Sequence, residues 1–503
     1  MGLPLPTEDE PIDITDFLET CGRGTLPFPP GTIGSIAEYI FAQSLYPIAE
    51  VATLAALLYF AGKVGRAYNV SGMGLNQYGF NIMDTGMGKG AAINGMATLD
   101  ALVRSQLADK HTLRKGPGQL PSMQGLRNAL VGTEKKKPRL CCLTINDEVG
   151  HFLQRLYDSR ATMNERDLRG FLLSLYTSSG GNKTIDETIY ADAAKNVGEL
   201  IAPAWSWLGG STPDVFYQIV NNEAVNEGLV PRCHIIEYKG PIPNSNEQFC
   251  NAKVPEWLIH DLKERTVSAK WLEDQQDMNA FGMREWVNVT FDSETTEWNR
   301  ELEQHIREKR QSLRESNQRM LAALWSRVQE KLYRVAALVA VGSTHPGAGM
   351  WSEVGSPVIT RDAYLWALDF TLRGSYSVMD RIETGETGEP NLAMQRNTAM
   401  EKCIQRYLER LKDAWTLNEF TKEFYIRPEM VKAKVITWRY ISKYLLRYPA
   451  YNEARCGFKR AIEETIEMFI KDERLKAVVP GDPLWGDYKG RTNCWYILDS
   501  RFK

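Results

Sequence analysis

A glycine-rich turn that carries one lysine is the stretch of this chain best suited to hold phosphate. An apolar run ends at Met83, and the turn after it leads into a segment of small residues. Successive backbone N–H groups at such a turn form a positive concavity, and a lysine ammonium adds a point charge. This chemistry predicts a site for a nucleotide polyphosphate, with contacts from Thr85, Gly86, Met87, Gly88, Lys89, Gly90 and Ala91.

The turn departs from the full phosphate-loop pattern at two positions. Met83 stands where the first glycine belongs, and Gly90 stands where a Ser or Thr hydroxyl would bind Mg²⁺. Any Mg²⁺ at this turn must therefore use water or another oxygen, such as the hydroxyl of Thr85. The pattern predicts nucleotide binding and leaves the rate of hydrolysis open.

Two adjacent carboxylates follow the apolar run 139–146 and could complete a hydrolytic site. Asp147 is the candidate ligand for Mg²⁺, and Glu148 is the candidate that orients and deprotonates the attacking water. The alternative is a helix N-terminus, where acidic side chains match the positive end of the helix dipole. The order of lysine turn and carboxylate pair favours the hydrolytic interpretation.

Three polar residues further along the chain are candidates for roles at the same site. Ser211 and Thr212 end a third apolar run and could sense hydrolysis between the γ-phosphate and the second carboxylate. The alternative for them is a helix cap before Pro213. Arg232 follows a glycine turn, where it could form a surface ion pair or reach the phosphate of a neighbouring subunit as an arginine finger. Composition alone favours the ion pair.

The alternation of strand-like and helical patterns indicates the fold class. Strands punctuated by glycine alternate with helices between residues 69 and 245, which predicts an α/β core with a mostly parallel sheet. On this basis we divide the chain into an N-terminal arm (1–30), an N-terminal helical segment (31–68), the α/β core (69–245), a helical region (246–415) and a winged-helix domain (416–503).

Composition limits the location and partners of the protein. The net charge of −3 gives no global attraction to nucleic acid, so such a partner would need a local basic patch. The eight cysteines form no CxxC pair, which predicts buried, reduced thiols and a cytoplasmic location. The N-terminal residues lack the order of a signal peptide, and the apolar segment 47–62 is too short to span a bilayer. We therefore expect no membrane association.

Two groups of basic residues could contact nucleic acid. The first lies on loops between sheet elements, where lysines can follow a phosphate backbone without reading its sequence, namely Lys110, Lys115, Lys135, Lys136 and Lys137. The alternative for this group is a solvated surface loop. The second is the stretch 432–447, in which Lys432, Lys434, Arg439, Lys443 and Arg447 alternate with aromatic residues. It could serve phosphate contact by a winged helix, or it could be an amphipathic packing helix.

The ordered set of motifs resembles a family of P-loop NTPases found in phages, plasmids and integrated elements, often as the helicase half of primase–helicases. The resemblance covers about residues 30 to 380 and rests on the helix 47–68, the phosphate loop 78–92 and four later stretches, 122–126, 146–150, 209–213 and 228–232, followed by the helix 324–338. No single motif is diagnostic, and the order of the set carries the resemblance.

The resemblance implies an ATP-dependent DNA helicase or translocase that uses ATP and Mg²⁺ in the replication of a phage or mobile element, within the cytoplasm of a bacterial host. It implies that Lys89 binds phosphate, that Asp147 holds the metal and that Glu148 activates the water. It also implies that Ser211 or Thr212 senses hydrolysis and that Arg232 is the arginine finger.

A finger acting on a neighbouring subunit requires head-to-tail contacts, so the resemblance also implies a ring, expected to be a hexamer, on single-stranded DNA. No primase motif is visible, so priming would come from a separate protein. Two alternatives remain: an NTP-binding switch or loader that assembles replication proteins on DNA, and a DNA-binding protein that does not hydrolyse nucleotide.

Overall fold

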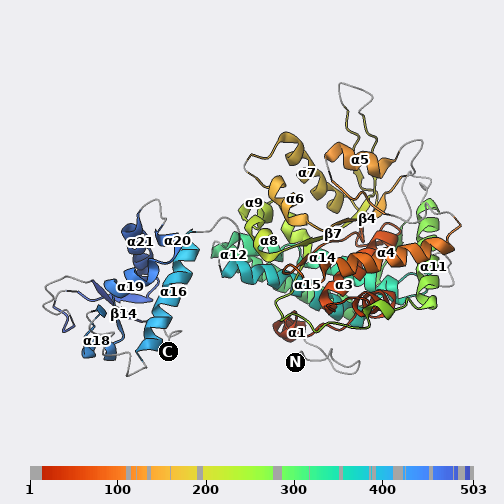
Figure 1. Ribbon diagram of the computed structural model, residues 1–503. Helices are drawn as coiled ribbons and strands as arrows, with labels where there is room; N and C mark the ends of the chain where they lie inside the picture. Colours follow the sequence, from red (N-terminus) through yellow and green to blue (C-terminus); the bar gives the residue numbers. More distant parts are fainter. Residues whose placement is uncertain are drawn as a thin grey trace. The chain divides into compact units, whose positions relative to one another are not determined.

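The computed structural model describes most of the chain and divides it into two compact units, Met1–Ile382 and Glu383–Lys503. The described residues are 14–108, 115–120, 122–132, 138–158, 160–189, 196–275, 286–316, 318–349, 355–384, 387, 392–411, 423–424, 426–452, 457–479, 481–484 and 493–498. We call the two units the N-terminal unit and the C-terminal unit and describe each by itself (Figure 1).

A four-stranded, all-parallel sheet forms the centre of the N-terminal unit. Its strands are β3 (Tyr78–Ile82), β4 (Cys141–Asn146), β7 (Ala204–Ser211) and β8 (Cys233–Glu237), and they lie in the order β4-β7-β3-β8. β7 therefore lies between β3 and β4, although it follows both in the sequence. An isolated parallel bridge between Lys115 and Leu143 continues the pairing beyond β4. This sheet confirms the predicted parallel α/β core.

Aromatic residues on β3 and β7 fill the space beside the sheet. Every residue of β7 is buried, including Trp205 and Trp207. The rings of Tyr78 and Phe80 on β3 meet the Trp207 ring edge to face, at centroid distances of 5.8 Å and 4.9 Å. The Trp207 indole N–H donates to Asn146 Oδ1 over 2.7 Å, so its polar atom is satisfied in the core. These contacts account for the tryptophan-rich run.

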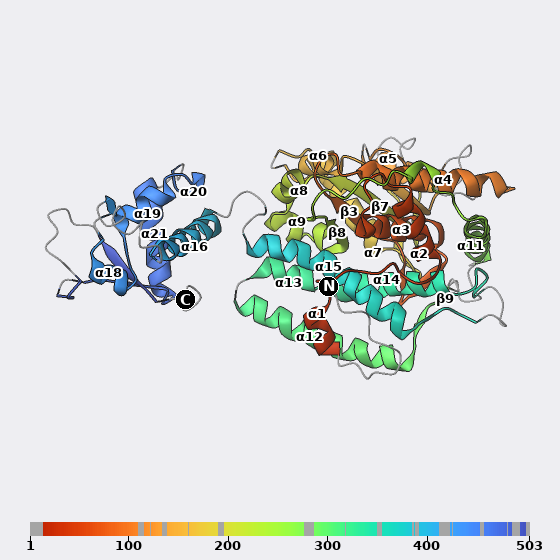
Figure 2. The same ribbon diagram turned by 60° about the horizontal axis from the view of Figure 1, so that its bottom comes forward.

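Helices cover both faces of the sheet. On one face α3 (Ala49–Val64) is buried along almost its whole length and packs on all four strands, and α4 (Lys89–Gln106) packs on α3. On the other face lie α6 (Val149–Leu156) and α7 (Met163–Thr177), so the layers are helix, sheet and helix (Figures 1 and 2). At Gly79 a Cβ atom would lie 2.6 Å from a Leu54 methyl carbon, so glycine on β3 allows α3 to approach closely.

The remaining helices of the N-terminal unit share the core of this layered structure. In chain order they are α1 (Ile14–Thr20), α2 (Gly31–Ala42), α5 (Met123–Val131), α8 (Pro213–Ile219), α9 (Asn222–Asn226), α10 (Leu229–Arg232), α11 (Glu256–Gln275), α12 (Ser293–Glu315), α13 (Arg319–Trp325), α14 (Val328–Ser343) and α15 (Arg361–Glu383). Short strands pair in three smaller sheets, namely β1 (Tyr68–Val70), β2 (Met73–Gly74), β5 (Thr184–Ile185), β6 (Leu200–Ile201), β9 (Val287–Asn288), β10 (Thr290–Phe291) and β11 (Val358–Ile359).

The N-terminal arm, helical segment, α/β core and most of the helical region belong to one unit, unlike the division drawn from the sequence. Ile14 and Leu18 of α1 are buried in the same hydrophobic cluster as the sheet strands and α14. Ile33 of α2 lies in that cluster as well, with no exposed surface. A continuous apolar core leaves no boundary at residues 30, 68 or 245, because composition changes along the chain while packing joins the segments.

The C-terminal unit has a core of its own and begins earlier than expected. It contains α16 (Leu392–Arg410), α18 (Pro428–Lys432), β12 (Val435–Thr437), α19 (Trp438–Leu445), α20 (Pro449–Asn452), α21 (Phe458–Lys471), β13 (Leu475–Ala477) and β14 (Cys494–Ile497). The strands form an antiparallel sheet in the order β12-β14-β13. The boundary lies at 382/383 and not at 415/416, because α16 buries Cys403 and Tyr407 against α19 and α21.

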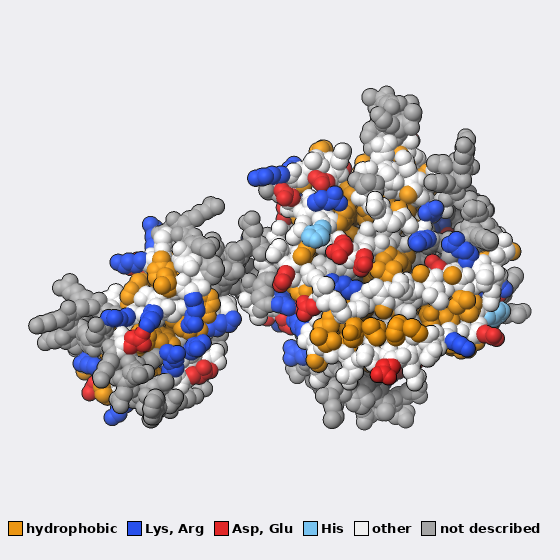
Figure 3. Space-filling model, in the orientation of Figure 1, with side chains coloured by type: hydrophobic (Ala, Val, Ile, Leu, Met, Phe, Trp, Pro, Cys, Tyr) orange, Lys and Arg blue, Asp and Glu red, His pale blue; other side chains and the backbone are white. Residues whose placement is uncertain are grey.

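The two units differ in the balance of their charged residues. Lys and Arg outnumber Asp and Glu in residues 383–503, whereas the reverse holds in residues 1–382. Figure 3 shows several basic side chains on the visible face of the C-terminal unit, with few acidic ones between them.

Within the described part of the chain, no helix combines the length and apolar character needed to cross a membrane.

Candidate functional site

Polar residues from three strands converge at the carboxyl edge of the parallel sheet. The last residue of β3, Ile82, pairs with Ser211 of β7 on one side and with Glu237 of β8 on the other. Asn146, which ends β4, pairs with Gly209 of β7. The carboxyl ends of parallel strands share one edge, so the lysine turn, the carboxylate pair and the 211–212 hydroxyls leave the sheet side by side.

A cavity of about 750 Å³ lies at this edge. Its lining includes the sequence-predicted residues Thr85, Gly86, Gly88, Lys89, Gly90, Ala91, Asp147, Glu148, Ser211 and Thr212. Met87 is the one loop residue that does not line it, because its side chain is buried in the hydrophobic core. The structure thus brings together ten of the residues that the sequence separates into three segments.

The glycine turn presents its backbone to this cavity. Gly86 and Gly88 have φ angles of 86° and 82°, in the left-handed region that favours glycine. Gly88 is the N-cap of α4, which begins at Lys89, and its first-turn N–H groups receive no side-chain cap. Those N–H groups and the helix dipole therefore favour an anion at the mouth of the helix.

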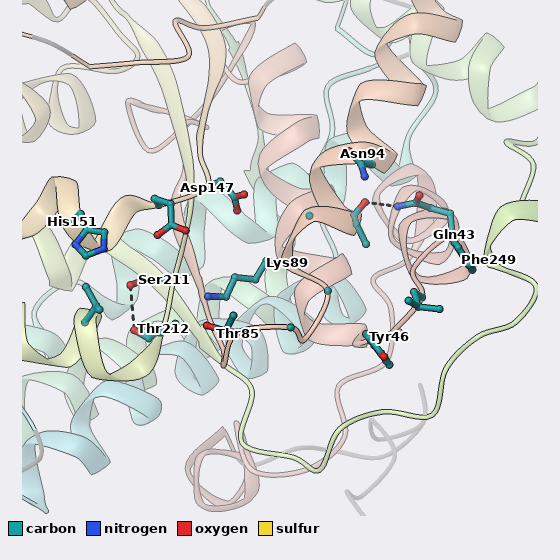
Figure 4. A pocket seen from close by; sticks show the side chains of 17 residues that line it. Gln43, Tyr46, Thr85, Lys89, Asn94, Asp147, His151, Ser211, Thr212 and Phe249 are labelled. Carbon is teal, nitrogen blue, oxygen red and sulfur yellow. Dashed lines mark hydrogen bonds between the residues drawn. The ribbon is translucent and has the colours of Figure 1, made fainter.

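Lys89 supplies the cation of the site. Its side chain is half-buried, and burial lowers its pKa, while Glu148, Asp147 and Asp84 act in the opposite direction. Figure 4 shows its ammonium pointing toward Thr85 and the space in front of Ser211 and Asp147. The described residues that line the cavity include no other lysine and no arginine. Lys89 therefore carries the positive charge on which the carboxylates of Glu148, Asp147 and Asp84 act.

The carboxylate pair is open to the same cavity. Asp147 and Glu148 are exposed, and Glu148 is the N-cap of α6 without a side-chain cap bond. Both interpretations of the pair thus apply, since the residues begin a helix and also face the cavity. At Gly210 a Cβ atom would lie 2.9 Å from the Asp147 carbonyl oxygen, so glycine lets the end of β4 lie against β7.

The hydroxyl pair lines the cavity together with the lysine and the carboxylates. Ser211 is buried and its Oγ donates to the Thr212 carbonyl over 3.2 Å. Thr212 is the N-cap of α8, with Pro213 at the first helical position, but its side chain makes no cap bond. The capping alternative therefore describes the position of Thr212 and not the contacts of its hydroxyl.

A second group of side chains lines the other end of the cavity and was not anticipated from the sequence. Gln43, Tyr46, Asn94 and Phe249 lie on the far side of the first turn of α4 from Asp147 (Figure 4). Gln43 donates to the Ala91 carbonyl through its side-chain amide. No motif signals these residues, because they come from the α2–α3 connection, α4 and the segment after β8.

Two hydrogen bonds fix this end of the cavity. The backbone N–H of Asn246 donates to the Leu45 carbonyl over 2.8 Å, and its side-chain amide donates to the Ala42 carbonyl over 2.7 Å. The segment that carries Phe249 is thereby attached to the connection that carries Tyr46. Tyr46 and Phe249 are both partly exposed, so the cavity has one apolar, aromatic end and one charged end.

Arg232 does not lie at this site. It directly precedes β8, at the amino edge of the sheet, where its Nη1 donates to the Gly228 carbonyl over 2.8 Å. The side chain is 7% exposed and its guanidinium lies 5.9 Å from the Tyr176 ring centroid. Neither expected role fits this placement, because a buried guanidinium forms no surface ion pair and cannot reach a neighbouring subunit.

The lysines proposed to contact nucleic acid are placed only in part. Lys110, Lys135, Lys136 and Lys137 lie outside the described residues. Lys115 is exposed, and its carbonyl accepts a hydrogen bond from Arg139 Nη1 over 3.0 Å. It does not line the cavity at the carboxyl edge of the sheet.

The protein oxygens at this cavity suit Mg²⁺ only when a phosphate ligand supplies further oxygens. No group of three or more His, Cys, Asp or Glu side chains among the described residues could hold a metal ion by itself. Asp147 and the Thr85 hydroxyl supply two oxygens at the cavity, and Mg²⁺ in proteins commonly combines one or two protein oxygens with phosphate oxygens and water. The residues present therefore fit a magnesium–nucleotide complex and not a bare metal site.

Comparison with known proteins gives no further guide to this site. No protein-family model matches the chain, and no curated protein matches its sequence. The fold and the chemistry of the cavity are therefore the guides to function.

Proposed function

We propose that the protein binds ATP with Mg²⁺ at this cavity and hydrolyses it. The observation that carries this proposal is the convergence of Lys89, Asp147, Glu148 and Ser211 at one edge of a parallel sheet. Phosphate oxygens need directed N–H donors and a cation, and hydrolysis needs a carboxylate that faces the attacking water. The cavity offers both within one volume of about 750 Å³.

Each group has a distinct role in the proposed reaction. The ammonium of Lys89 and the N–H groups that begin α4 offset the negative charge of the β- and γ-phosphates. Glu148 orients the attacking water and accepts its proton, while a hydroxyl of Ser211 or Thr212 reports whether the γ-phosphate is present. Asp147, with the Thr85 hydroxyl, would hold Mg²⁺, which supplies charge stabilisation at the phosphate oxygens when bound.

The aromatic end of the cavity supports a nucleotide over inorganic polyphosphate. Tyr46 and Phe249 line the part of the cavity beyond the first turn of α4, where a base attached to a phosphate chain would lie (Figure 4). An aromatic ring offers stacking area that a polyphosphate cannot use. The side-chain amide of Asn94 adds a polar group of the kind that selects a base.

The C-terminal unit supports nucleic acid as the partner of this ATPase. Its elements follow the order α16, α18, β12, α19, α20, α21, β13 and β14, and β14 lies between the other two strands; helices followed by a small antiparallel sheet of this kind resemble a winged helix. Tyr440, Ile441 and Leu445 of α19 are buried, whereas the basic residues of its neighbourhood are exposed, namely Lys432, Lys434, Arg439, Lys443 and Arg447. Two of these basic residues, Arg439 and Lys443, lie on α19 itself, so this helix contributes both to the core and to a basic surface.

On these grounds we extend the proposal to an ATP-dependent helicase or translocase that acts on single-stranded DNA in replication. The cavity contains no arginine of its own among the described residues, so a transition-state arginine would come from a second copy. Such a contact is head-to-tail, and a closed head-to-tail assembly is a ring, with a hexamer as our expectation. Arg232 is not proposed for this role.

A second candidate function is an ATP-dependent switch or loader that assembles other proteins on DNA. The observation that favours it is Gly90, which leaves the first turn of α4 without the hydroxyl that binds Mg²⁺ in the full phosphate-loop pattern. A site with this loss can bind nucleotide tightly and turn it over slowly.

Nucleotide binding and hydrolysis by the wild type and by Lys89→Ala test the proposal. We expect the variant to lose ATP binding, and we expect Lys270→Ala, which removes a partly exposed lysine of α11 that is paired with Asp274, to leave binding unchanged. Turnover that single-stranded DNA stimulates supports the motor, and tight binding without turnover supports the switch. Wild-type protein that binds no nucleotide at any Mg²⁺ concentration would refute both.

A further inference from the structure

A second cavity of the N-terminal unit has the composition of an anion site. It encloses about 450 Å³ between α12, α13 and the end of α9, and it shares no lining residue with the nucleotide cavity. Three arginines line it, Arg310 and Arg314 from α12 and Arg319 from the start of α13. Ala322 and Ala323 form part of the remaining wall, and their small side chains leave room for a ligand. We call this cavity the arginine pocket.

The three arginines form a cluster without a carboxylate partner. The lining of the arginine pocket contains no Asp or Glu. Throughout the described part of the chain, no ion pair involves Arg310, Arg314 or Arg319. Arg310 and Arg314 are also four residues apart on one helix, where like charges repel each other. The fold therefore holds three cations close together, and no acidic residue stands among the described residues that line the pocket.

Nearby carboxylates are already engaged with other cations. Glu227, next to the lining residue Asn226, pairs with Arg169 over 2.9 Å. Glu330 pairs with Arg327 over 2.7 Å and with Arg334 over 2.9 Å. Glu227 and Glu330 are thereby held by arginines that do not line the arginine pocket.

One buried hydrogen-bond donor of the arginine pocket, on Arg310, has no acceptor among the described residues. The donor is the Nε of this arginine. Burial lowers the pKa of its guanidinium, and the adjacent Arg314 and Arg327 lower it further. A buried guanidinium donor without an acceptor is costly, and an anion that enters the pocket would supply the missing oxygen.

We propose that the arginine pocket binds phosphate groups. Arginine offers planar pairs of N–H donors that match the oxygens of a phosphate, and three of them around one volume can hold more than one phosphate group. Neighbouring phosphates of a nucleic-acid strand and a free polyphosphate share this chemistry. The proposal goes beyond the ATPase site and does not depend on it, because the two cavities are separate.

The test compares two double variants of α12 and α13 with the same change in net charge. Arg314→Gln/Arg319→Gln removes the two exposed arginines of the pocket. Arg300→Gln/Arg307→Gln is the matched control, since these arginines lie on α12, are each 70% exposed and are paired with Glu297 and Glu303. Thermal melting of both variants checks that each one folds.

Two probes distinguish the sources of the phosphate. A fluorescent oligodeoxythymidylate, titrated at several salt concentrations, reports a nucleic-acid backbone. Inorganic tripolyphosphate, added to both variants in a Lys89→Ala background, reports a free polyphosphate through the shift in melting temperature. We expect the pocket variant to bind the oligonucleotide about ten-fold more weakly than the control at low salt. Its salt slope should be smaller by about 0.7 for each phosphate that the variant no longer neutralises.

Every outcome bears on the proposal. Weaker oligonucleotide binding in the pocket variant alone supports the site and identifies a strand as the source. A smaller tripolyphosphate shift in that variant alone supports the site and identifies a free polyphosphate. Equal responses of the two variants to both probes would overturn the proposal. Adding Arg310→Gln to the pocket variant should enlarge the effect, and failure of the ATPase tests would leave these results unaffected.

Discussion

Charged residues at the two edges of the parallel sheet have opposite surroundings: an open cavity at one edge and a buried ion pair at the other. At the carboxyl edge Lys89 faces an open cavity and two exposed carboxylates. At the amino edge Arg334 is fully buried, and its Nη2 donates to Glu330 over 2.9 Å and to the Tyr176 carbonyl over 3.0 Å. Arg334 is thus paired with a carboxylate of its own chain, whereas Lys89 faces a cavity that is open to a ligand.

Lys331 extends this contrast at the amino edge. Its ammonium donates to Ser375 Oγ over 3.0 Å and to the Cys233 carbonyl over 3.3 Å, at the first residue of β8. Lys331 is 1% exposed, whereas Lys89 is half-buried with its ammonium in the cavity. Lysines at opposite ends of one sheet therefore have different surroundings, and on the proposed function we expect substitutions at the two edges to separate activity from stability.

The largest effect that we expect is the loss of turnover in Glu148→Gln. Removing a general base lowers kcat by about 10²–10⁴-fold, while ATP binding persists because Lys89 and the α4 N–H groups remain. Steady-state ATPase assays with equilibrium nucleotide binding measure the two effects separately. Glu187→Gln, an exposed carboxylate away from the cavity, is the control. Unchanged kcat in Glu148→Gln would remove this residue from the reaction.

At the opposite edge Arg334→Ala should destabilise the fold. Glu330 and Asn76 would lose the guanidinium that bonds them, and breaking a buried pair costs about 3–5 kcal/mol. Urea unfolding followed by tryptophan fluorescence measures the change. Arg300→Ala breaks an ion pair that is exposed, so we expect its cost to be about 1 kcal/mol or less. Equal costs for the two variants would contradict the contrast between the edges.

The pH dependence of stability tests the burial of Lys331 at the amino edge. Burial lowers the pKa of Lys331 to about 8, against the opposing influence of Cys233 and Glu330. Between pH 8 and the ordinary value of 10.5, the unfolded chain holds this proton and the folded chain does not. The free energy of unfolding should therefore rise with pH across this window, by about 1.4 kcal/mol per pH unit at most from this group.

Lys331→Met removes that contribution. The difference in unfolding free energy between wild type and variant should change steadily from pH 8 to pH 10.5, whichever of the two is more stable at neutral pH. Urea unfolding at a series of pH values measures it. A difference that stays constant across the window would show that Lys331 keeps an ordinary pKa in the folded protein.

The smallest effect concerns the missing hydroxyl at the carboxyl edge. A Cβ atom at Gly90 would meet no other atom within 4 Å, so a serine has room there. We expect Gly90→Ser to lower the Mg²⁺ concentration needed for half-maximal turnover by about ten-fold or less, because it adds one neutral oxygen ligand. Gly90→Ala is the matched control for helix propensity. Identical Mg²⁺ dependence in both variants would mean that position 90 does not face the metal.

The sequence predicted the carboxyl edge far better than the amino edge. The lysine turn, the carboxylate pair and the hydroxyl pair each stand directly after an apolar run, and the end of a strand is where a parallel sheet gathers its polar groups. Arg232 follows a glycine turn in a similar way, yet it precedes β8 and is buried. Local pattern signals a polar residue beside a strand but not whether the space around it is open.

Tertiary packing also decided features that no local pattern encodes. The aromatic end of the cavity joins Tyr46 to Phe249 from segments far apart in the sequence, and it is held by the hydrogen bonds of Asn246. The arginine pocket joins α12, a charged helix, to α13, in which Arg319 is the one charged residue. The unit boundary at 382/383 likewise depends on the packing of α16 against α19 and α21.

What the sequence alone determined is the set of local features: a glycine turn that carries one lysine and has no hydroxyl at position 90, a carboxylate pair, and strands that alternate with helices. These features are local, since turn geometry and strand or helix periodicity depend on residues a few positions apart. Only the tertiary structure decided which groups meet. The position of β7 between β3 and β4 arises from long-range packing, and that position brings Ser211 to Lys89 and Asp147 while Arg232 stays at the opposite edge.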